Sequence, residues 1–430
     1  MLIGLCHTMA SDWGDFSLYQ TRYAPQSTAV LPPDSDTIAQ YHKLPDIEKP
    51  EFLKNYFQNQ PHKRTFDSLL IQGSRTELSR FFSLMPAQTL FSLPEQNIYL
   101  IRVPDSFHGE EFRKNIKAEF PALLVETNQD LIGLPDLNHN PPSGSVLNYS
   151  PWLDTLNNRL GPPKRKIPIA ILDSGVSAHE DLPPVRPMSG MDPNGHGTHV
   201  AGILAAIQGN GIGVDGVSSQ TNLRSYPVLG TNGEGRLIDL VSAVIQACRD
   251  GNEIINLSLG TKEHSQILFD ILTVVGKKCI LVAASGNDGT DQPYLPASHP
   301  LVIGVGSVNK DGMLSNFSNY GSNLKISFFG EDVLSTWPRN TYKTLSGTSM
   351  AAPQVSGFLA EALSRIPTRL DPSLILDAVQ RHKTRSVTVL NIPHSLMDPP
   401  LFAYELSNAY KRSQGMIEDV EPDLRRRTAQ

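Results

Sequence analysis

Between residues 66 and 135 the spacing of apolar side chains switches repeatedly between the period of strands and the period of helices. Short apolar runs predict strands at residues 67–72, 88–93, 97–103 and 122–127. Ser74 and Glu77 have the spacing of a capping box, and the apolar residues after them are three or four positions apart. A second helix is predicted at residues 107–120. This order, strand–helix–strand–strand–helix–strand, is typical of small ferredoxin-like α+β domains.

From about residue 150 to residue 410 apolar strands alternate with helices. Strands are predicted at residues 167–172, 223–228, 254–257, 279–284 and 301–308, and helices around 200–206, 237–248 and 349–366. Strands that are apolar along their whole length indicate burial on both faces. The pattern therefore predicts an α/β fold, with a doubly wound, mostly parallel sheet covered by helices on both faces.

Three segments show no sustained periodicity. Residues 1–65 form an amino-terminal extension to which the sequence assigns no function. Residues 136–149 contain many helix- and strand-breaking residues and are expected to be an exposed linker. Residues 411–430 are charged and are expected to be a tail.

Composition narrows the class of protein. The 430 residues include 37 basic and 43 acidic ones, and a net charge of −6 gives no general attraction to nucleic acid. The strongest apolar runs have the length of strands, so no membrane span is expected. The first residues lack the positive charge of a secretory signal, and the compartment is left open. Cys6, Cys248 and Cys279 predict no disulfide framework, and each is expected to be a small buried apolar residue.

Three motifs carry chemistry. Asp173 ends a buried strand in Ile171-Leu172-Asp173-Ser174-Gly175, although an Asp before Ser-Gly also forms turns. His196 and His199 lie in a glycine-rich segment before a helix, where a metal site is an alternative interpretation. Ser349 opens the helix that runs to about residue 366, where an N-cap is the simpler interpretation. Taken together in the order Asp, His, Ser, the three motifs outweigh these alternatives.

In these motifs the chain resembles the subtilisin-like serine proteases, the subtilases, over about residues 150–410. The resemblance implies that Ser349 attacks a peptide carbonyl, that His196 is the general base and that Asp173 orients it. His199 is then structural. Asn287, in Ser285-Gly286-Asn287-Asp288-Gly289, matches the residue that donates a hydrogen bond to the oxyanion.

The resemblance also implies a substrate cleft. An extended peptide would lie along Ser258, Leu259 and Gly260, and the opposite wall of the first specificity pocket would comprise Ala283, Ala284, Ser285 and Gly286. Tyr294 falls near the floor of that pocket, where an inward ring would admit only small side chains. Asp288 falls near its rim and would favour a basic side chain.

Further expectations follow from the family. Asp181 and Asn210 match two ligands of a structural calcium site, while the chemistry itself needs no cofactor. Residues 66–135 match the ferredoxin-like propeptide of many subtilases, with self-cleavage between residues 134 and 149. Substrates would be extended proteins or peptides. The alternatives are a non-catalytic peptide-binding homologue and a metal-dependent hydrolase acting through His196 and His199.

Overall fold

A computed structural model describes most of the chain outside the two termini and the linker. The described residues are 68–133 and 149–416, except residue 86 and residues 104–108, 187–190, 322–323, 383–385, 390–391 and 396–398. The extension at residues 1–65, nearly all of the linker and the proposed cleavage stretch lie outside the described residues. Among the helices described, none is both long and apolar enough to cross a membrane.

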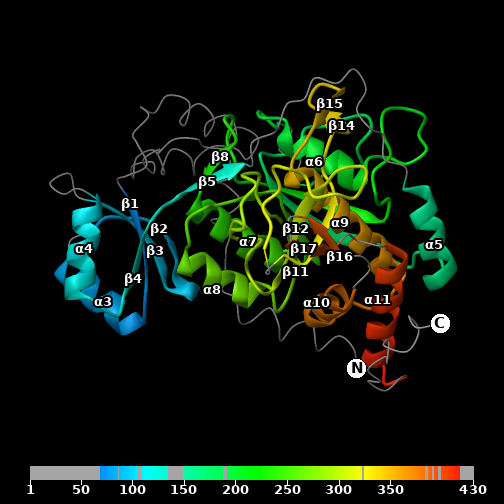
Figure 1. The fold of residues 1–430 in the computed structure, drawn as a ribbon. Coiled ribbons are helices and arrows are strands. Elements are labelled where there is room, and N and C mark those ends of the chain that lie inside the picture. The colour runs from blue at the N-terminus through cyan, green and yellow to red at the C-terminus, as the bar shows by residue number, and fades with distance from the viewer. Residues whose placement is uncertain are drawn as a thin grey trace, which may run out of the picture.

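A six-stranded parallel sheet forms the centre of the larger body (Figure 1). The strand order is β13-β12-β11-β9-β6-β7. The bounds are β6 Ile167–Asp173, β7 Thr221–Pro227, β9 Ile254–Leu257, β11 Ile280–Ala284, β12 Val302–Val308 and β13 Ile326–Phe329. The predicted parallel sheet is confirmed, and each of its predicted strands is present within a few residues.

The central strands of the sheet are buried on both faces because most of their side chains are apolar. In β6, Ile169 and Ile171 pack with helices α6 (His196–Ala205) and α9 (Thr348–Ser364). Ala170 and Leu172 point to the opposite face, which is covered by α7 (Leu237–Arg249) and α8 (Gln266–Val275). Period-two alternation thus supplies both cores of a layered α/β fold.

The smaller amino-terminal body contains a four-stranded antiparallel sheet in the order β2-β3-β1-β4. Its strands are β1 Ser68–Gln72, β2 Thr89–Leu93, β3 Ile98–Arg102 and β4 Leu124–Thr127, and its helices are α3 Arg75–Leu84 and α4 Gly109–Glu119. The capping box forms as predicted, since Ser74 Oγ accepts from the Glu77 amide at 3.2 Å.

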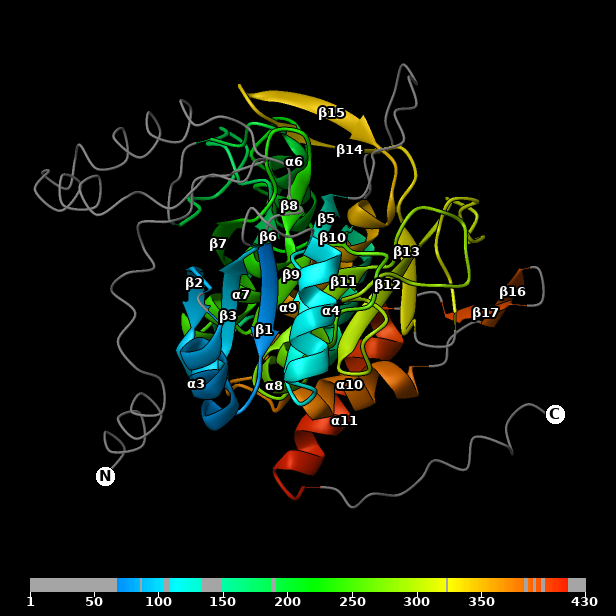
Figure 2. The same cartoon turned by 90° about the vertical axis from the view of Figure 1, so that its left-hand side faces the viewer.

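This small sheet is also buried on both faces. Leu69 and Ile71 pack under α3 and α4 with Phe81 and Phe112. Leu70 points the other way and belongs to the core that includes α7 and α8. Figures 1 and 2 show the small sheet lying beside these two helices. The amino-terminal body therefore covers an apolar surface of the larger body.

The chain then continues into β5 (Asp130–Gly133), a strand that the apolar pattern does not predict. It forms the middle of a three-stranded antiparallel sheet between β10 (Leu259–Gly260) and β8 (Glu234–Arg236). Gly133 pairs with Leu259 and Ile132 with Gly260. The end of the amino-terminal body is thus inserted as a strand between two segments of the larger body.

The remaining elements lie at the periphery of the larger body. They are α5 Ser150–Leu160, the hairpin of β14 Val333–Trp337 and β15 Thr341–Leu345, α10 Pro372–Arg381, the hairpin of β16 Ser386–Val389 and β17 Ile392–Ser395, and α11 Pro399–Ser413. Helix α11 corrects one expected boundary, because it continues to Ser413, inside the segment expected to be a tail.

The expectation for the cysteines is wrong in one respect. Cys248 and Cys279 form a disulfide that joins the end of α7 to the residue before β11. The spacing of these residues gave no sign of pairing, because they are 31 positions apart and meet only when α7 packs on the sheet. Cys279 is buried, as expected, whereas Cys248 is only half-buried and Cys6 lies outside the described residues.

Candidate active site

Asp173 is the last residue of β6, at the carboxyl end of the central sheet, and is fully buried. Its Oδ1 accepts a hydrogen bond of 2.8 Å from the Ser174 amide. Open α/β sheets place their sites at this edge because every strand ends there and the loops provide side chains. The carboxylate is therefore held at the edge of the sheet with a fixed direction.

His196 is the first residue of α6, and its Nδ1 lies 2.6 Å from Asp173 Oδ1. His196 can approach Asp173 this closely because the residues on either side of it, Gly195 and Gly197, have no side chain. A Cβ on Gly197 would collide with the carbonyl of Gly175. Gly195 has a φ of 95°, in the region that favours glycine. The two glycines bring the start of α6 against the end of β6.

Ser349 lies in the first turn of α9 and is buried. Its hydroxyl donates to the carbonyl of Ser258 at 3.2 Å, and the Ser258 hydroxyl donates to the carbonyl of Ser349 at 3.2 Å. The N-cap of α9 is Gly347, so Ser349 is not the capping residue that the simpler interpretation requires. Its hydroxyl lies at the positive end of a long helix.

Asn287 faces the same helix start. Its Oδ1 accepts from the backbone amide and the hydroxyl of Thr348, both at 2.9 Å. These bonds fix the orientation of the amide group, so that the oxygen faces Thr348 and the NH₂ group lies on the side of Gly347. A donor is thereby positioned beside the backbone that carries Ser349.

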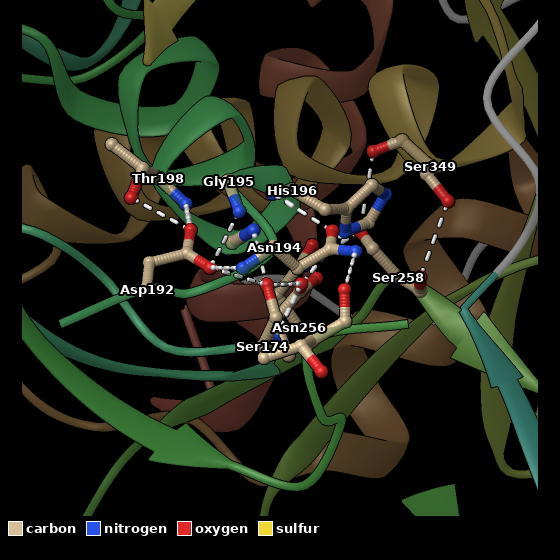
Figure 3. A network of polar contacts seen from close by, with 12 residues as sticks. Ser174, Asp192, Asn194, Gly195, His196, Thr198, Asn256, Ser258 and Ser349 are labelled. Atoms are coloured by element: carbon tan, nitrogen blue, oxygen red, sulfur yellow. Dashed lines mark hydrogen bonds and ion pairs between the residues drawn. The ribbon is translucent and has the colours of Figure 1, made fainter. Parts of the chain in front are cut away.

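Asp192 is a buried residue of the site that the sequence did not single out. Its carboxylate accepts from the amides of Gly195 and Thr198, each at 2.7 Å, and from the Ser174 hydroxyl at 2.8 Å (Figure 3). Ser174 also accepts from the Gly197 amide at 3.0 Å. Burial raises the pKa of the Asp192 carboxyl. The sequence did carry one sign of this role. Asp192 comes shortly before a predicted helix, where a carboxylate often accepts hydrogen bonds from the first backbone amides of the helix.

The predicted cleft residues lie in three places. Leu259 and Gly260 form β10 and pair with strand β5. Ser285 and Gly286 lie beside Asn287, where Gly286 N donates to the Thr348 hydroxyl at 3.2 Å. Ala283 and Ala284 lie inside β11 and pair with β12, so they are part of the buried sheet.

Comparison with known proteins decides the family. The family model described as "Subtilase family" matches residues 164–398, more than half of the chain. The chain belongs to the subtilases. The match lies within the region 150–410 that the motifs indicated, and it includes Asp173, His196, Asn287 and Ser349.

Individual relatives agree with this assignment. The Thermophilic serine proteinase of Bacillus sp. (strain AK1) is 40% identical over 204 residues, which are 45% of this subtilase and 51% of that protein. Subtilisin Savinase of Lederbergia lenta is 37% identical over 211 residues, 47% of this chain and 78% of that protein. The Minor extracellular protease Epr of Bacillus subtilis (strain 168) is 36% identical over 219 residues, which are 49% of this chain and 34% of that protein. The chain thus matches about half or less of two of these relatives.

A solved structure shows the same fold. Fervidolysin from Fervidobacterium pennivorans, described as a keratinolytic enzyme related to subtilisin, superposes with a TM-score of 0.65. The superposition covers 79% of this subtilase and 61% of that chain, at 20% identity. The subtilisin-like α/β fold predicted from the sequence is therefore confirmed.

The second histidine of the subtilase motif is held away from the reacting groups. His199 Nε2 lies 2.9 Å from the carbonyl of Lys343, and burial lowers the pKa of His199 to about 3. The Nδ1 atom of His196, in contrast, contacts Asp173 Oδ1. The two rings have separate partners, and no group of three or more His, Cys, Asp or Glu within the described part of the chain has a metal-binding arrangement. This arrangement does not favour the metal-dependent alternative.

The two residues expected to bind calcium do meet, but as a hydrogen-bonded pair. Asn210 Nδ2 donates to Asp181 Oδ1 at 2.7 Å, while Asn210 Oδ1 accepts from the Ile212 amide. The other oxygen of Asp181 accepts from the Val214 amide at 2.9 Å and the Tyr342 hydroxyl at 3.1 Å. A cation needs oxygens that point to it, whereas here donors surround the carboxylate. These atoms, as arranged, do not fit a calcium ion.

Proposed function

We propose that this subtilase is a serine endopeptidase that hydrolyses peptide bonds through Asp173, His196 and Ser349 and an acyl-enzyme intermediate. The observation that carries the proposal is the 2.6 Å contact between His196 Nδ1 and Asp173 Oδ1, beside a helix whose first turn holds Ser349. A hydrolase of this kind needs a base whose proton position is fixed.

The contacts support a specific order of proton transfers. An ionised carboxylate only accepts, so Nδ1 of His196 carries the proton that Asp173 receives as a hydrogen bond. Nε2 is then the basic nitrogen that takes the proton of Ser349 as its oxygen attacks the carbonyl. The same nitrogen returns that proton to the leaving amine, which leaves the acyl group on Ser349. Water then repeats the sequence and releases the acid.

The negative oxygen formed during the attack needs a donor that is already in place. The NH₂ group of Asn287 fits this role because its oxygen is held by Thr348. A preorganised donor stabilises the transition state without reorganising at the moment of reaction.

We propose further that the chain is a zymogen whose residues 66–135 inhibit the enzyme until the following stretch is cut. Strand β5 supports this proposal, because it pairs with β10 in the place of an extended peptide substrate. Gly133 pairs with Leu259, the neighbour of Ser258, whose carbonyl accepts from Ser349. An extended peptide bound along β10 in the direction of β5 would lead toward Ser349.

Polar contacts also attach the amino-terminal body to two helix starts. Asn128 Oδ1 accepts from the Ile238 amide at 3.2 Å at the start of α7. Glu126 accepts from the Gln266 amide at 2.8 Å and from the Ser265 hydroxyl at 2.7 Å at the start of α8. Carboxylate and amide oxygens stabilise helix amino termini. These contacts support the proposal that the amino-terminal body assists folding as well as blocking the cleft.

The experiment is the intact mass of the purified chain after incubation, compared with Ser349→Ala and with the exposed control Ser413→Ala. Wild type and the control should lose everything up to a point between residues 134 and 149, and the Ser349→Ala chain should stay whole. A fluorophosphonate probe should label the first two proteins only. If the probe labels none of them, the chain is a non-catalytic binder and the proposal fails.

A further inference from the structure

Tyr294 lies between the two segments that border the reacting groups. Its amide donates to the carbonyl of Ser285 at 2.9 Å. The next residue, Leu295, exchanges backbone hydrogen bonds with Thr261 at 2.8 and 3.2 Å. The backbone of Tyr294 is thus fixed on one side to the segment before Asn287 and on the other to the segment after β10. The side chain is 4% exposed.

The ring spans the space between these segments. A Cβ built on Gly260 would lie 3.2 Å from Tyr294 Cδ2, and one built on Gly286 would lie 3.1 Å from Tyr294 Cδ1. The two edges of the ring therefore face two glycines on opposite sides. The space between the segments is filled by the phenol ring, and the glycines are what make room for it.

The outer end of the ring is held by charged residues. The Tyr294 hydroxyl donates to Asp288 Oδ2 at 2.5 Å, and Lys262 Nζ lies 2.9 Å from the same oxygen. Lys262 also lies 5.6 Å from the centre of the ring. Partial burial opposes ionisation of Asp288, but the hydrogen bonds from Tyr294 and Lys262 hold its pKa below the usual range. The negative charge of Asp288 is paired with Lys262, which argues against the expectation that Asp288 would attract a basic substrate residue.

The substrate residue before the cut bond must lie at this point. Its carbonyl carbon must meet Ser349, and its oxygen must meet Asn287. β5 shows the line of an extended chain along β10, and a substrate bound in the same register would bring its next residue opposite Ser258. A residue there has the segment 258–260 on one side and the segment 285–287 on the other. The space between these two segments is then the space available to its side chain.

We propose, resting on the proposed peptidase activity, that Tyr294 closes this pocket and that the enzyme cuts after glycine, alanine and serine. The Lys262–Asp288 pair holds the ring in place and contributes no charge preference. A side chain larger than serine would have to displace the ring, break its hydrogen bond to Asp288 and desolvate that carboxylate.

The test is a library of peptide substrates that differ only at the residue before the cut bond, with enzyme concentration set by fluorophosphonate titration. Wild type should have a kcat/KM for alanine about 100-fold above that for phenylalanine or leucine, the scale of a misfit in a closed pocket. Tyr294→Gly should raise the phenylalanine value at least about 10-fold. The matched variant Tyr294→Phe keeps the ring, and its preference for small residues should persist.

Two results would overturn the proposal: efficient cleavage after phenylalanine by wild type, or an unchanged profile in Tyr294→Gly. A binding measurement tests the pocket proposal separately from the proposed peptidase activity. Ser349→Ala should bind a product peptide that ends in alanine more tightly than one that ends in phenylalanine. If the probe labels no serine but this difference in affinity is present, the pocket assignment stands and the catalytic one fails. Equal affinities would overturn the pocket assignment even if Tyr294→Gly did not fold.

Discussion

Nδ1 of His196 lies 2.6 Å from Oδ1 of Asp173, although the two residues are 23 positions apart. Asp173 ends a central strand, and His196 starts a helix that packs on the end of that strand. The loop between them is anchored by Asp192, which binds the amides of Gly195 and Thr198. The contact therefore depends on a strand end, a helix start and a buried carboxylate that holds both in register.

Asp173→Asn should abolish most activity without unfolding the protein. An amide at this position can donate to Nδ1, which favours the tautomer whose Nε2 carries a proton and cannot act as a base. The expected loss in kcat is about 10⁴-fold, the magnitude known for the same change in trypsin. Steady-state kinetics and the melting temperature measure the two effects. The exposed variant Asp311→Asn is the control, and a loss below about tenfold in Asp173→Asn would contradict the assigned role.

Asn287→Ala should lower kcat about 100- to 1,000-fold, the loss known for one oxyanion donor in subtilisin itself. KM should change little, because the donor acts on charge that develops only in the transition state. In Asn287→Ala the Thr348 amide also loses the oxygen that accepts its hydrogen bond. Asn287→Asp therefore serves as a second variant, because it keeps an acceptor for Thr348 but has no NH₂ group. Full activity in Asn287→Asp would remove Asn287 from the mechanism.

Glu126→Gln should shorten the delay before activity appears in the full-length chain. The change removes a negative charge from the start of α8 while keeping an acceptor, which weakens the attachment by about 1 kcal/mol. Release of the inhibitory body should then be about fivefold faster. The delay is measured as the lag in hydrolysis of a peptide substrate. Glu119→Gln, at the exposed end of α4, is the control and should show the wild-type lag. An equal lag in both variants would argue against a role of Glu126 in attaching the amino-terminal body to α8.

Replacing Cys248 and Cys279 together by serine should lower the free energy of unfolding by about 3–4 kcal/mol. The disulfide closes a loop of 31 residues, which reduces the entropy of the unfolded chain. Thermal unfolding of the Ser349→Ala background avoids self-digestion during the measurement. Dithiothreitol should reproduce the shift in the parent protein and have no effect on the double variant. Reaction of Cys248 and Cys279 with a thiol reagent in the unfolded parent protein, before any reductant is added, would contradict this expectation.

His199 should make the fold sensitive to acid. Its pKa is lowered to about 3 in the folded protein, chiefly by burial, while an unfolded histidine keeps a value near 6.5. Between these values the unfolded state binds the extra proton, so stability falls as pH decreases, by up to about 1.4 kcal/mol per unit. His199→Gln should remove this part of the slope, whereas His264→Gln, at an exposed position, should not. Identical slopes of stability against pH in wild type and His199→Gln would refute the assignment.

The sequence by itself determined the features that depend on local pattern. The apolar strands, such as 167–172, specify a sheet buried on both faces because a strand that is apolar throughout cannot face water. The capping box at Ser74 fixes the start of α3, since both of its bonds lie within one turn. The order of Asp173, His196 and Ser349 indicated the family because each motif is specific in its own short segment.

Only the tertiary structure decided the features that join distant segments. β5 has a short sequence with no partner nearby, and its pairing with β10 spans more than a hundred positions. The disulfide, the anchoring role of Asp192 and the paired charge of Asp288 likewise depend on side chains meeting after the sheet and helices have packed. Tyr294 shows the same limit. The resemblance placed Tyr294 near a pocket, but the room for its ring comes from Gly260 and Gly286, which lie in segments far apart in the sequence. Periodicity describes which way a residue faces within its own element, and it carries no information about which distant segment fills the space opposite.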